Sequence, residues 1–347
     1  MIRVAIIGAG IGAQHLEGYL ALPDAWEVSL IVDLNSNRAR AIAKDIPVVT
    51  EISVALLDPA IDVIDICLPP HLHVPVTLQA LAASKHVICE KPLTTSMADI
   101  DRLRVAKKTA QREVFPVFQY RFGTAFAALD ALRAADLLGK PILAAAETHW
   151  ARDAEYYAVP WRGTWAGEQG GAIVTHAIHA HDLISHHMGP IKTVSATLAT
   201  RANPIETEDT AGLVFELENG ALATSSITLG AARDETRLRF VYENLTATSG
   251  NNPYAPAQEQ WTFEARNPVD QAKIDRVVHA ASARGGFAGA FDAISAALMG
   301  APGKAVGFED AARSIDLITA SYHAARTAQK VALPILRTHP LYSGWQP

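Results

Sequence analysis

Residues 2–13 read IRVAIIGAGIGA, and this stretch decides the fold expected for the first part of the chain. Ile2–Ile7 is an apolar run rich in β-branched residues, which predicts a buried strand. The next six residues follow the pattern G-x-G-x-x-A, and a helical pattern continues to about Leu22. A second apolar strand, Val28–Val32, ends in Asp33. This order of strand, glycine turn, helix, strand and acid indicates a dinucleotide site.

Each small residue of the turn has a distinct expected role. Gly8 permits the tight turn, Gly10 lets a pyrophosphate approach the backbone, and Ala13 allows close packing of helix and strand. The N–H groups of the first helical turn face the phosphates. The alternative is a glycine-rich turn without a ligand, which the complete strand–turn–helix context disfavours. The dinucleotide contacts expected in this stretch are Gly8, Gly10, Ile11, Gly12 and Ala13.

Asp33 bears on the choice of nucleotide. Its carboxylate can accept hydrogen bonds from the 2′-hydroxyl of a ribose and would repel a 2′-phosphate, so NAD is expected rather than NADP. Arg38 is expected near the same ribose. If NADP bound instead, Ser36 and Arg38 would be the suspected contacts of its 2′-phosphate.

The alternation of strands and helices continues after Asp33. It predicts a doubly wound parallel sheet with helices on both faces, so residues 1–121 are expected to form an NAD-binding Rossmann domain. The further strands expected are Val63–Leu68, Val87–Cys89 and Val114–Phe118, and the helices are Arg38–Lys44, Val74–Ala83 and Met97–Gln111.

Residues 86–94, HVICEKPLT, place charged groups directly after one of these strands. Ligands of open α/β sheets lie outside the carboxyl ends of the strands, so Glu90 and Lys91 are expected at the site. A solvated loop is the alternative. Leu68-Pro69-Pro70 ends a strand on the same edge and either lines the nicotinamide side or forms a simple turn. His71 and His73 are expected to be capping or surface residues.

The pattern changes after Gln119-Tyr120-Arg121-Phe122 to longer strands that alternate polar and apolar residues, typical of an antiparallel sheet with one covered face. Residues 122–347 are therefore expected to form an α+β domain with an open sheet. Its strands are Ile142–Trp150, Thr193–Thr200, Ala211–Leu217, Ala221–Leu229, Arg237–Tyr242 and Gln260–Glu264; its helices are Thr124–Leu138, Phe287–Leu298 and Phe308–Thr327. Residues 251–271 are expected to be exposed loops around one strand, and the tail from Pro334 wraps this domain or a partner subunit.

Two further stretches carry candidate binding residues. Residues 150–171 form an aromatic loop with Tyr156, Trp161 and Arg162, suited either to sugar-like ligands or to an oligomer contact. The next stretch predicts a helix to about Met188, whose polar stripe resembles one wall of an active site. The alternatives are a solvated face and a metal site built from His176, His179 or neighbouring histidines; no Cys or Glu stands at ligand spacing, so no metal is expected. The stripe comprises Thr175, His179, Asp182 and His186.

Composition limits the partners and location of the protein. The chain has 347 residues and a formal net charge of −6, so no nucleic-acid footprint is expected. Its apolar runs are too short to span a bilayer, and no signal peptide is evident at the start of the sequence. The only two cysteines, Cys67 and Cys89, lie in expected buried strands, which suits a reducing cytoplasm.

Taken in order, these motifs resemble the Gfo/Idh/MocA family, which includes glucose–fructose oxidoreductase and inositol dehydrogenase. The resemblance covers nearly the whole chain. It is carried by the glycine fingerprint, Asp33, Cys89-Glu90-Lys91-Pro92, Gln119-x-Arg121-Phe122, Trp161-Arg162, Gly170-Gly171 and His179-x-x-Asp182.

The resemblance implies oxidation or reduction of a carbinol carbon in a sugar, sugar derivative or inositol, with NAD as cofactor and Lys91 and His179 as catalytic residues. It also implies homodimers or homotetramers packed through the C-terminal sheet.

Two alternatives to this function stay open, an NAD-dependent glycoside hydrolase that uses transient oxidation and a non-catalytic NAD- or sugar-binding regulator. The family commonly has Asp four residues before the histidine, where this chain has Thr175. The expected cofactor contacts also include Leu68, Pro69, Glu90, Lys91 and Gln119, and the expected substrate contacts are Lys91, Arg121, Trp161, Arg162, Thr175, His179 and Asp182.

Overall fold

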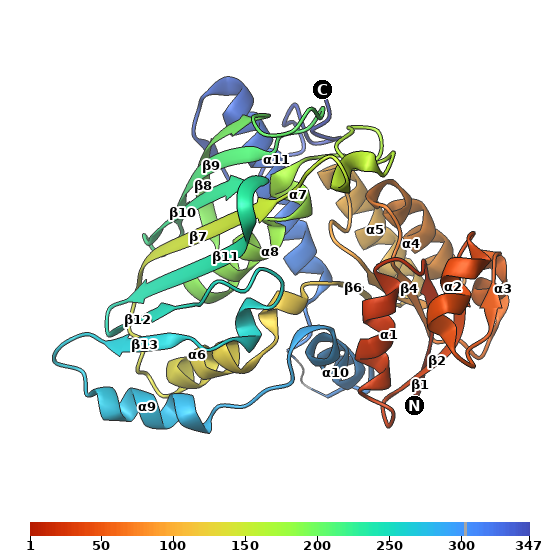
Figure 1. Ribbon diagram of the computed structural model, residues 1–347, viewed down its shortest axis with the longest axis horizontal. Coiled ribbons are helices and arrows are strands. Elements are labelled where there is room, and N and C mark those ends of the chain that lie inside the picture. The colour runs from red at the N-terminus through yellow and green to blue at the C-terminus, as the bar shows by residue number, and fades with distance from the viewer. Residues whose placement is uncertain (302–303) are drawn as a thin grey trace. The chain divides into compact units, whose positions relative to one another are not determined.

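The structure is a computed structural model that describes residues 1–301 and 304–347. The chain forms two compact units (Figure 1). Unit 1 comprises residues 1–119 and 287–312, and unit 2 comprises residues 120–286 and 313–347. The division expected from the sequence, at residue 121, leaves residues 287–312 in the second domain, whereas their contacts join them to unit 1.

Unit 1 is built on a six-stranded sheet in the order β3-β2-β1-β4-β5-β6, with every neighbouring pair parallel. The doubly wound sheet expected from the sequence is thereby confirmed. The short β3 and α3 were not predicted, because neither is long enough to show a periodic pattern. The strands are β1 (Ile2–Ile7), β2 (Trp26–Val32), β3 (Val48–Val49), β4 (Val63–Ile66), β5 (His86–Cys89) and β6 (Val114–Pro116); the helices are α1 (Gly12–Leu20), α2 (Ser36–Ala43), α3 (Ile52–Leu57), α4 (His73–Ala82) and α5 (Met97–Ala110).

Helix α10 (Gly286–Leu298) explains why the later segment belongs to unit 1. The ring of Phe291 stacks on Tyr19 with centroids 4.0 Å apart, and its carbonyl accepts a hydrogen bond from the Trp26 indole at 3.1 Å. Gly18 leaves room for this ring, since a Cβ there would lie 2.9 Å from it. Because Phe291 lies so far along the sequence from Tyr19 and Trp26, no local sequence pattern could predict these contacts.

Unit 2 is built on an eight-stranded sheet in the order β13-β12-β11-β7-β10-β9-β8-β14. Only the β7–β10 pair is parallel among the described strands of this sheet, so the mostly antiparallel sheet expected from the sequence is confirmed. Alternate residues of β9 and β10 are buried and exposed, which leaves one face covered and one open. The strands are β7 (Pro141–Ala151), β8 (Ile191–Ala199), β9 (Thr210–Leu217), β10 (Leu222–Thr228), β11 (Gly230–Tyr242), β12 (Leu245–Thr248), β13 (Thr262–Ala265) and β14 (Val331–Ala332).

Several elements of unit 2 differ from the sequence expectation. Its helices are α6 (Thr124–Ala134), α7 (Ala172–Thr175), α8 (Ile178–Met188), α9 (Gln271–Ala280) and α11 (Phe308–Thr327), the last of which begins in unit 1. Helix α9, β12 and β14 were not predicted, and β11 begins seven residues before the expected strand. The tail folds onto its own unit: the buried Trp345 stacks on Tyr322 and donates to the carbonyl of Gln169 at 2.7 Å.

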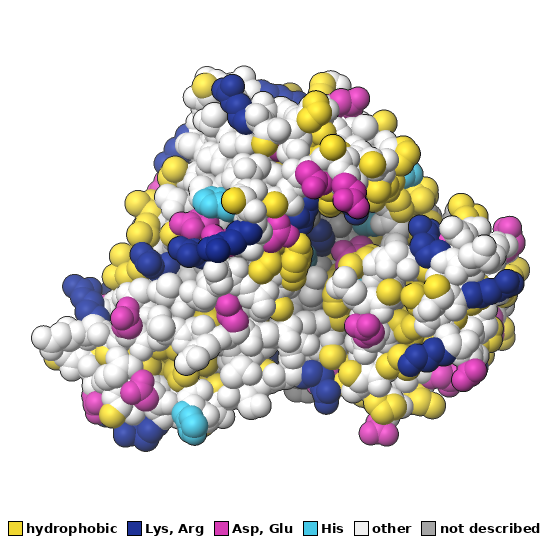
Figure 2. Space-filling view, in the orientation of Figure 1, with side chains coloured by type: hydrophobic (Ala, Val, Ile, Leu, Met, Phe, Trp, Pro, Cys, Tyr) yellow, Lys and Arg dark blue, Asp and Glu magenta, His cyan; other side chains and the backbone are white. Residues whose placement is uncertain are grey.

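The surface view, the cysteines and the helices each add one observation about the described residues. On the face shown in Figure 2, acidic and basic side chains are interspersed among hydrophobic ones, so this face has no broad patch of one charge. Cys67 and Cys89 are both free thiols in the core of unit 1. Within residues 1–301 and 304–347, none of the helices combines the length and apolar character that crossing a membrane requires.

Candidate active site

The glycine turn after β1 has the geometry that its sequence predicts. Gly8 has φ +105°, and a Cβ there would lie 2.4 Å from the carbonyl oxygen of Cys67. A side chain at Gly12 would meet Ile6 at 2.8 Å, whereas Gly10 has open space around it. Gly8 and Gly12 are therefore required by packing, while Gly10 leaves room for a ligand to approach the backbone.

Asp33 follows β2 and accepts hydrogen bonds from three residues. Its carboxylate accepts from the backbone N–H groups of Ala9 and Asn35, both at 2.7 Å, and from the Arg38 guanidinium at 2.8 Å. Burial raises the pKa of Asp33, but these hydrogen bonds and the charge of Arg38 outweigh it and hold the pKa below its ordinary value. A negative charge is thus fixed beside the glycine turn, where an adenosine ribose would be held.

Gln119 adds an observation that fits a bound dinucleotide. This residue begins a short turn after β6, and its side-chain oxygen is buried without a hydrogen-bond partner in the described part of the chain. A buried acceptor without a donor is costly, so a ligand that donates to it would stabilise the site. Together with the space at Gly10, this makes the residues of unit 1 suited to hold NAD.

Lys91 lies in a turn at the carboxyl end of β5, and two buried histidines hold this turn. His73, expected to be a capping or surface residue, is fully buried; its ring nitrogens lie 2.6 Å from the carbonyl oxygen of Pro92 and 2.7 Å from that of Leu68. It therefore connects the Leu68-Pro69 turn to the Lys91-Pro92 turn, whose peptide bond is cis. His15, which lies on α1, contacts the side chain of Glu90: its Nε2 is 3.1 Å from Glu90 Oε1.

The candidate residues of unit 2 meet near the start of α8. Arg121 donates to both carboxylate oxygens of Asp182, at 2.7 and 2.5 Å, and both side chains are at least nine-tenths buried. The buried His179 stacks on Tyr120, with ring centroids 4.2 Å apart and planes 17° from parallel. Two expected substrate contacts thus bind each other and fix the region around the histidine.

Thr175 does not continue the polar stripe of this helix, so that prediction was wrong. The chain breaks at His176, with φ −120° and ψ −59°, and α8 starts anew at Ile178. Thr175 donates to the carbonyl of Gly171 at 2.9 Å and shares a 2.6 Å hydrogen bond with the His176 ring. Local hydrogen bonds of a threonine compete with continuation of a helix.

The loop between β7 and α7 combines arginine and aromatic side chains. The Arg162 guanidinium lies 3.9 Å from the ring centre of Tyr156, and Arg152 lies 4.8 Å from the same centre. Arg152 also pairs with Asp234 at 3.0 Å, whereas Arg162 has no carboxylate within ion-pair distance among the described residues. The Nε atoms of both arginines are buried and have no hydrogen-bond acceptor in the part of the chain that the structure describes.

Three buried residues were missed in the sequence. Glu208 accepts from the backbone N–H groups of Gly171 and Ile173 and from the Tyr322 hydroxyl, and so holds the Gly170-Gly171 turn. His15 and Asp65 lie together in unit 1. Asp65 was detectable, because a charged residue inside an apolar strand needs a buried partner.

Two groups of side chains offer metal-ligand atoms in the described residues. They are His15, Asp65 and Cys67 in unit 1, and Asp130, His186 and His187 in unit 2. Neither His176 nor His179, the histidines considered from the sequence, belongs to such a group in residues 1–301 and 304–347.

The fold and site define an NAD-binding Rossmann protein with a second domain built on an open, mostly antiparallel sheet. Residues 2–118 match the family model described as "Oxidoreductase family, NAD-binding Rossmann fold", and residues 126–248 match the Gfo/Idh/MocA C-terminal domain. The chain belongs to the Gfo/Idh/MocA family.

Similar proteins include two inositol dehydrogenases and one solved structure. Myo-inositol 2-dehydrogenase of Thermotoga maritima is 28% identical over 64% of this chain and 66% of its own length, just under two thirds. Inositol 2-dehydrogenase of Arthrobacter is 27% identical over 75% and 77%. The WlbA dehydrogenase of Bordetella pertussis, crystallised with NADH and UDP-GlcNAcA, has a TM-score of 0.85 and 25% identity over 96% of this chain and 98% of that one.

Proposed function

We propose that this protein is an NAD-dependent dehydrogenase acting on a carbinol carbon of a sugar, sugar derivative or polyol. The observation that carries the proposal is the placement of Lys91 at the carboxyl end of β5, in the same parallel sheet as β1, whose carboxyl end leads into the glycine turn; only β4 lies between these two strands. The inositol dehydrogenases among its relatives support the same type of reaction.

The chemical roles divide between the cofactor and particular residues of the chain. Bound NAD supplies the hydride acceptor or donor. Lys91 hydrogen-bonds the reacting oxygen and stabilises the negative charge that develops on it. His179 or Lys91 exchanges the proton, and the Tyr120 stack keeps the imidazole in one orientation. Leu68, Pro69 and Glu90 shape the nicotinamide side of unit 1.

Substrate recognition is assigned to unit 2. Trp161 and Tyr156 offer apolar faces to the C–H groups of a sugar ring, and Thr175 offers a hydroxyl. The Arg121–Asp182 pair fixes the wall around His179 and presents its remaining hydrogen-bonding capacity to substrate hydroxyls.

Arg162 refines the substrate class. A half-buried guanidinium that stacks on aromatic rings and has no described carboxylate partner favours an anionic group on the substrate. The UDP-GlcNAcA bound to the WlbA dehydrogenase is such a compound. We therefore propose that acidic sugar derivatives are better substrates than their neutral counterparts.

The test measures NADH formation with matched pairs of neutral and acidic sugars, inositols and nucleotide sugars. Wild-type protein should reduce NAD with at least one compound, and Arg162→Gln should raise KM for the acidic member of a pair more than for the neutral one. Lys91→Ala should lower kcat by roughly two to three orders of magnitude while NAD still binds, because an interaction made mainly in the transition state is lost. Lys108→Ala, at an exposed position of α5, is the matched control.

Two results would redirect the assignment. Release of an aglycone from a glycoside without net NADH formation would favour a hydrolase that uses transient oxidation. NAD and sugar binding without either reaction, and without an effect of Lys91→Ala, would favour a regulator.

We also propose a cytoplasmic location, which the two buried free thiols support.

A further inference from the structure

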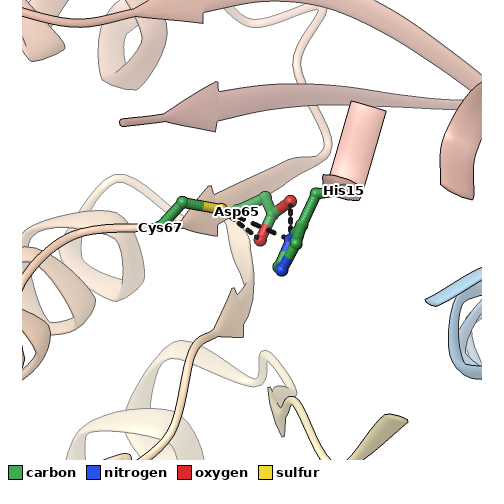
Figure 3. A group of neighbouring side chains, drawn as sticks. All are labelled: His15, Asp65 and Cys67. Atoms are coloured by element: carbon green, nitrogen blue, oxygen red, sulfur yellow. Dashed lines mark hydrogen bonds and ion pairs between the residues drawn. The ribbon is translucent and has the colours of Figure 1, made fainter. Parts of the chain in front are cut away.

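A series of hydrogen-bonded, buried ionisable groups in unit 1 leads to the backbone of Lys91. The His15 side chain, on α1, is wholly buried, and its Nδ1 lies 2.8 Å from an oxygen of Asp65, on β4 (Figure 3). The same oxygen accepts a hydrogen bond from the Tyr19 hydroxyl at 2.9 Å. Cys67 Sγ lies 3.3 Å from the same ring nitrogen.

The other side of the His15 ring connects this group to the catalytic turn. Its Nε2 lies 3.1 Å from Oε1 of Glu90, and Oε2 of Glu90 accepts the backbone N–H of Lys91 at 3.0 Å. Three successive hydrogen bonds therefore join Asp65, in the middle of the sheet, to the backbone of Lys91. The Glu90 side chain is 9% exposed, so water has little access to this path.

The contacts define the charge of His15. Ionised carboxylate oxygens only accept, so a histidine between two ionised carboxylates donates from both ring nitrogens, as an imidazolium. Burial lowers the pKa of His15, but the charge and hydrogen bond of Asp65, with Cys67, outweigh it and hold the pKa well above the ordinary value. One cation thus lies between two buried carboxylates.

A metal site explains the group less well. A metal ion would need the Cys67 thiolate, yet burial and Asp65 raise the pKa of this thiol to about 12. Glu90 could not complete the same coordination sphere, because it contacts the opposite nitrogen of the His15 ring. The hydrogen-bonded chain accounts for every one of these contacts.

We propose that His15 is a positioning residue: it fixes the Glu90 carboxylate and, through it, the backbone of Lys91. The proposal rests on the catalytic role of Lys91 given above. The direction of the Lys91 ammonium depends on its backbone, and a displacement of about 1 Å at a reacting group can cost about 100-fold in rate. His73 fixes the other end of the turn through the carbonyl of Pro92, which leaves Glu90 as the side held by His15.

The first measurement needs no substrate. In His15→Gln, hydrogen exchange of the Lys91 amide should be at least about tenfold faster than in the wild type, because its acceptor is no longer held. Tyr19→Phe is the matched control: it removes one hydrogen bond from Asp65 in the same buried group but leaves the Glu90 contact intact. Equal Lys91 exchange in the two variants would overturn the proposal.

The second measurement uses turnover. His15→Gln should lower kcat by roughly 10- to 100-fold with KM for NAD little changed, and combining it with Glu90→Gln should add almost nothing, because both act through one contact. Additive losses would overturn the proposal. If His15→Gln does not fold, Glu90→Gln is measured alone, because Glu90 is the more exposed end of the hydrogen-bonded series. It should show both the faster exchange of the Lys91 amide and the lower kcat, and the absence of these two effects overturns the proposal.

Lys91→Ala separates this proposal from the assigned function. If Lys91→Ala is inactive while His15→Gln keeps wild-type turnover and amide exchange, only the positioning role fails. If Lys91→Ala is fully active, the function assigned to Lys91 fails, and amide exchange in His15→Gln still reports whether His15 holds the turn.

Discussion

At the scale of single residues, Asp33 is the residue expected to set cofactor choice through a local contact. Its carboxylate neutralises Arg38, which could otherwise bind a 2′-phosphate. Asp33→Ala should weaken NAD binding and strengthen NADP binding, so that a preference of at least about tenfold for NAD is lost. Titration of both nucleotides into the apo protein, followed by fluorescence, measures the change.

The exposed Asp45, after α2, supplies the control for charge alone. Asp45→Ala removes the same charge from unit 1 and should leave the NAD preference as it is. Tighter binding of NADP than of NAD by the wild type would contradict the role given to Asp33 and would make Arg38 the dominant contact of the nucleotide.

At the scale of elements, the sequence predicted what periodicity and spacing encode. The parallel strands of unit 1, the glycine turn and the position of Lys91 follow from local patterns. The break between α7 and α8 does not, because it depends on the hydrogen bonds of Thr175 with Gly171 and His176. The pairing of His15 with Asp65 and Glu90 joins residues 50 and 75 positions apart, and no local pattern reports such a contact.

Helix α11 carries an element-scale prediction about pH. Asp316 is buried and accepts the backbone N–H of Ile335 at 2.9 Å, which ties the tail to the helix. Burial raises the pKa of Asp316 to about 6. Because the folded state holds this proton more tightly than the unfolded chain, the stability that protonation supplies is complete below about pH 4 and is lost as pH rises through 6.

Asp316→Asn keeps an acceptor for Ile335 without the ionisation. The variant should match wild-type stability near pH 4 and exceed it by roughly 2–3 kcal/mol at pH 8, the value of a shift of about two pKa units. Urea unfolding at both pH values measures the difference. A gain that is equal at the two pH values would show that Asp316 does not titrate in this range.

At the scale of the whole molecule, the open face of the unit 2 sheet predicts self-association. Leu143 and Leu222 are neighbours in the parallel β7–β10 pair, and Val214 projects from the same face on β9. Their exposed fractions are 39%, 49% and 53%. Exposed aliphatic side chains at adjacent positions favour burial against a second copy, the homodimer or homotetramer that the family resemblance implies.

Leu222→Glu tests this expectation by placing a carboxylate where the neighbouring chain would bury it. An unpaired buried charge costs several kcal/mol, so the subunit dissociation constant should rise by at least about 100-fold. Leu57→Glu adds the same charge at an 80% exposed leucine of α3 in unit 1 and should leave association unchanged. Sedimentation velocity over a concentration series distinguishes the two variants. If Leu222→Glu sediments as the wild type does, the open face is not the contact between subunits, and an oligomer seen in the wild type must form through another surface.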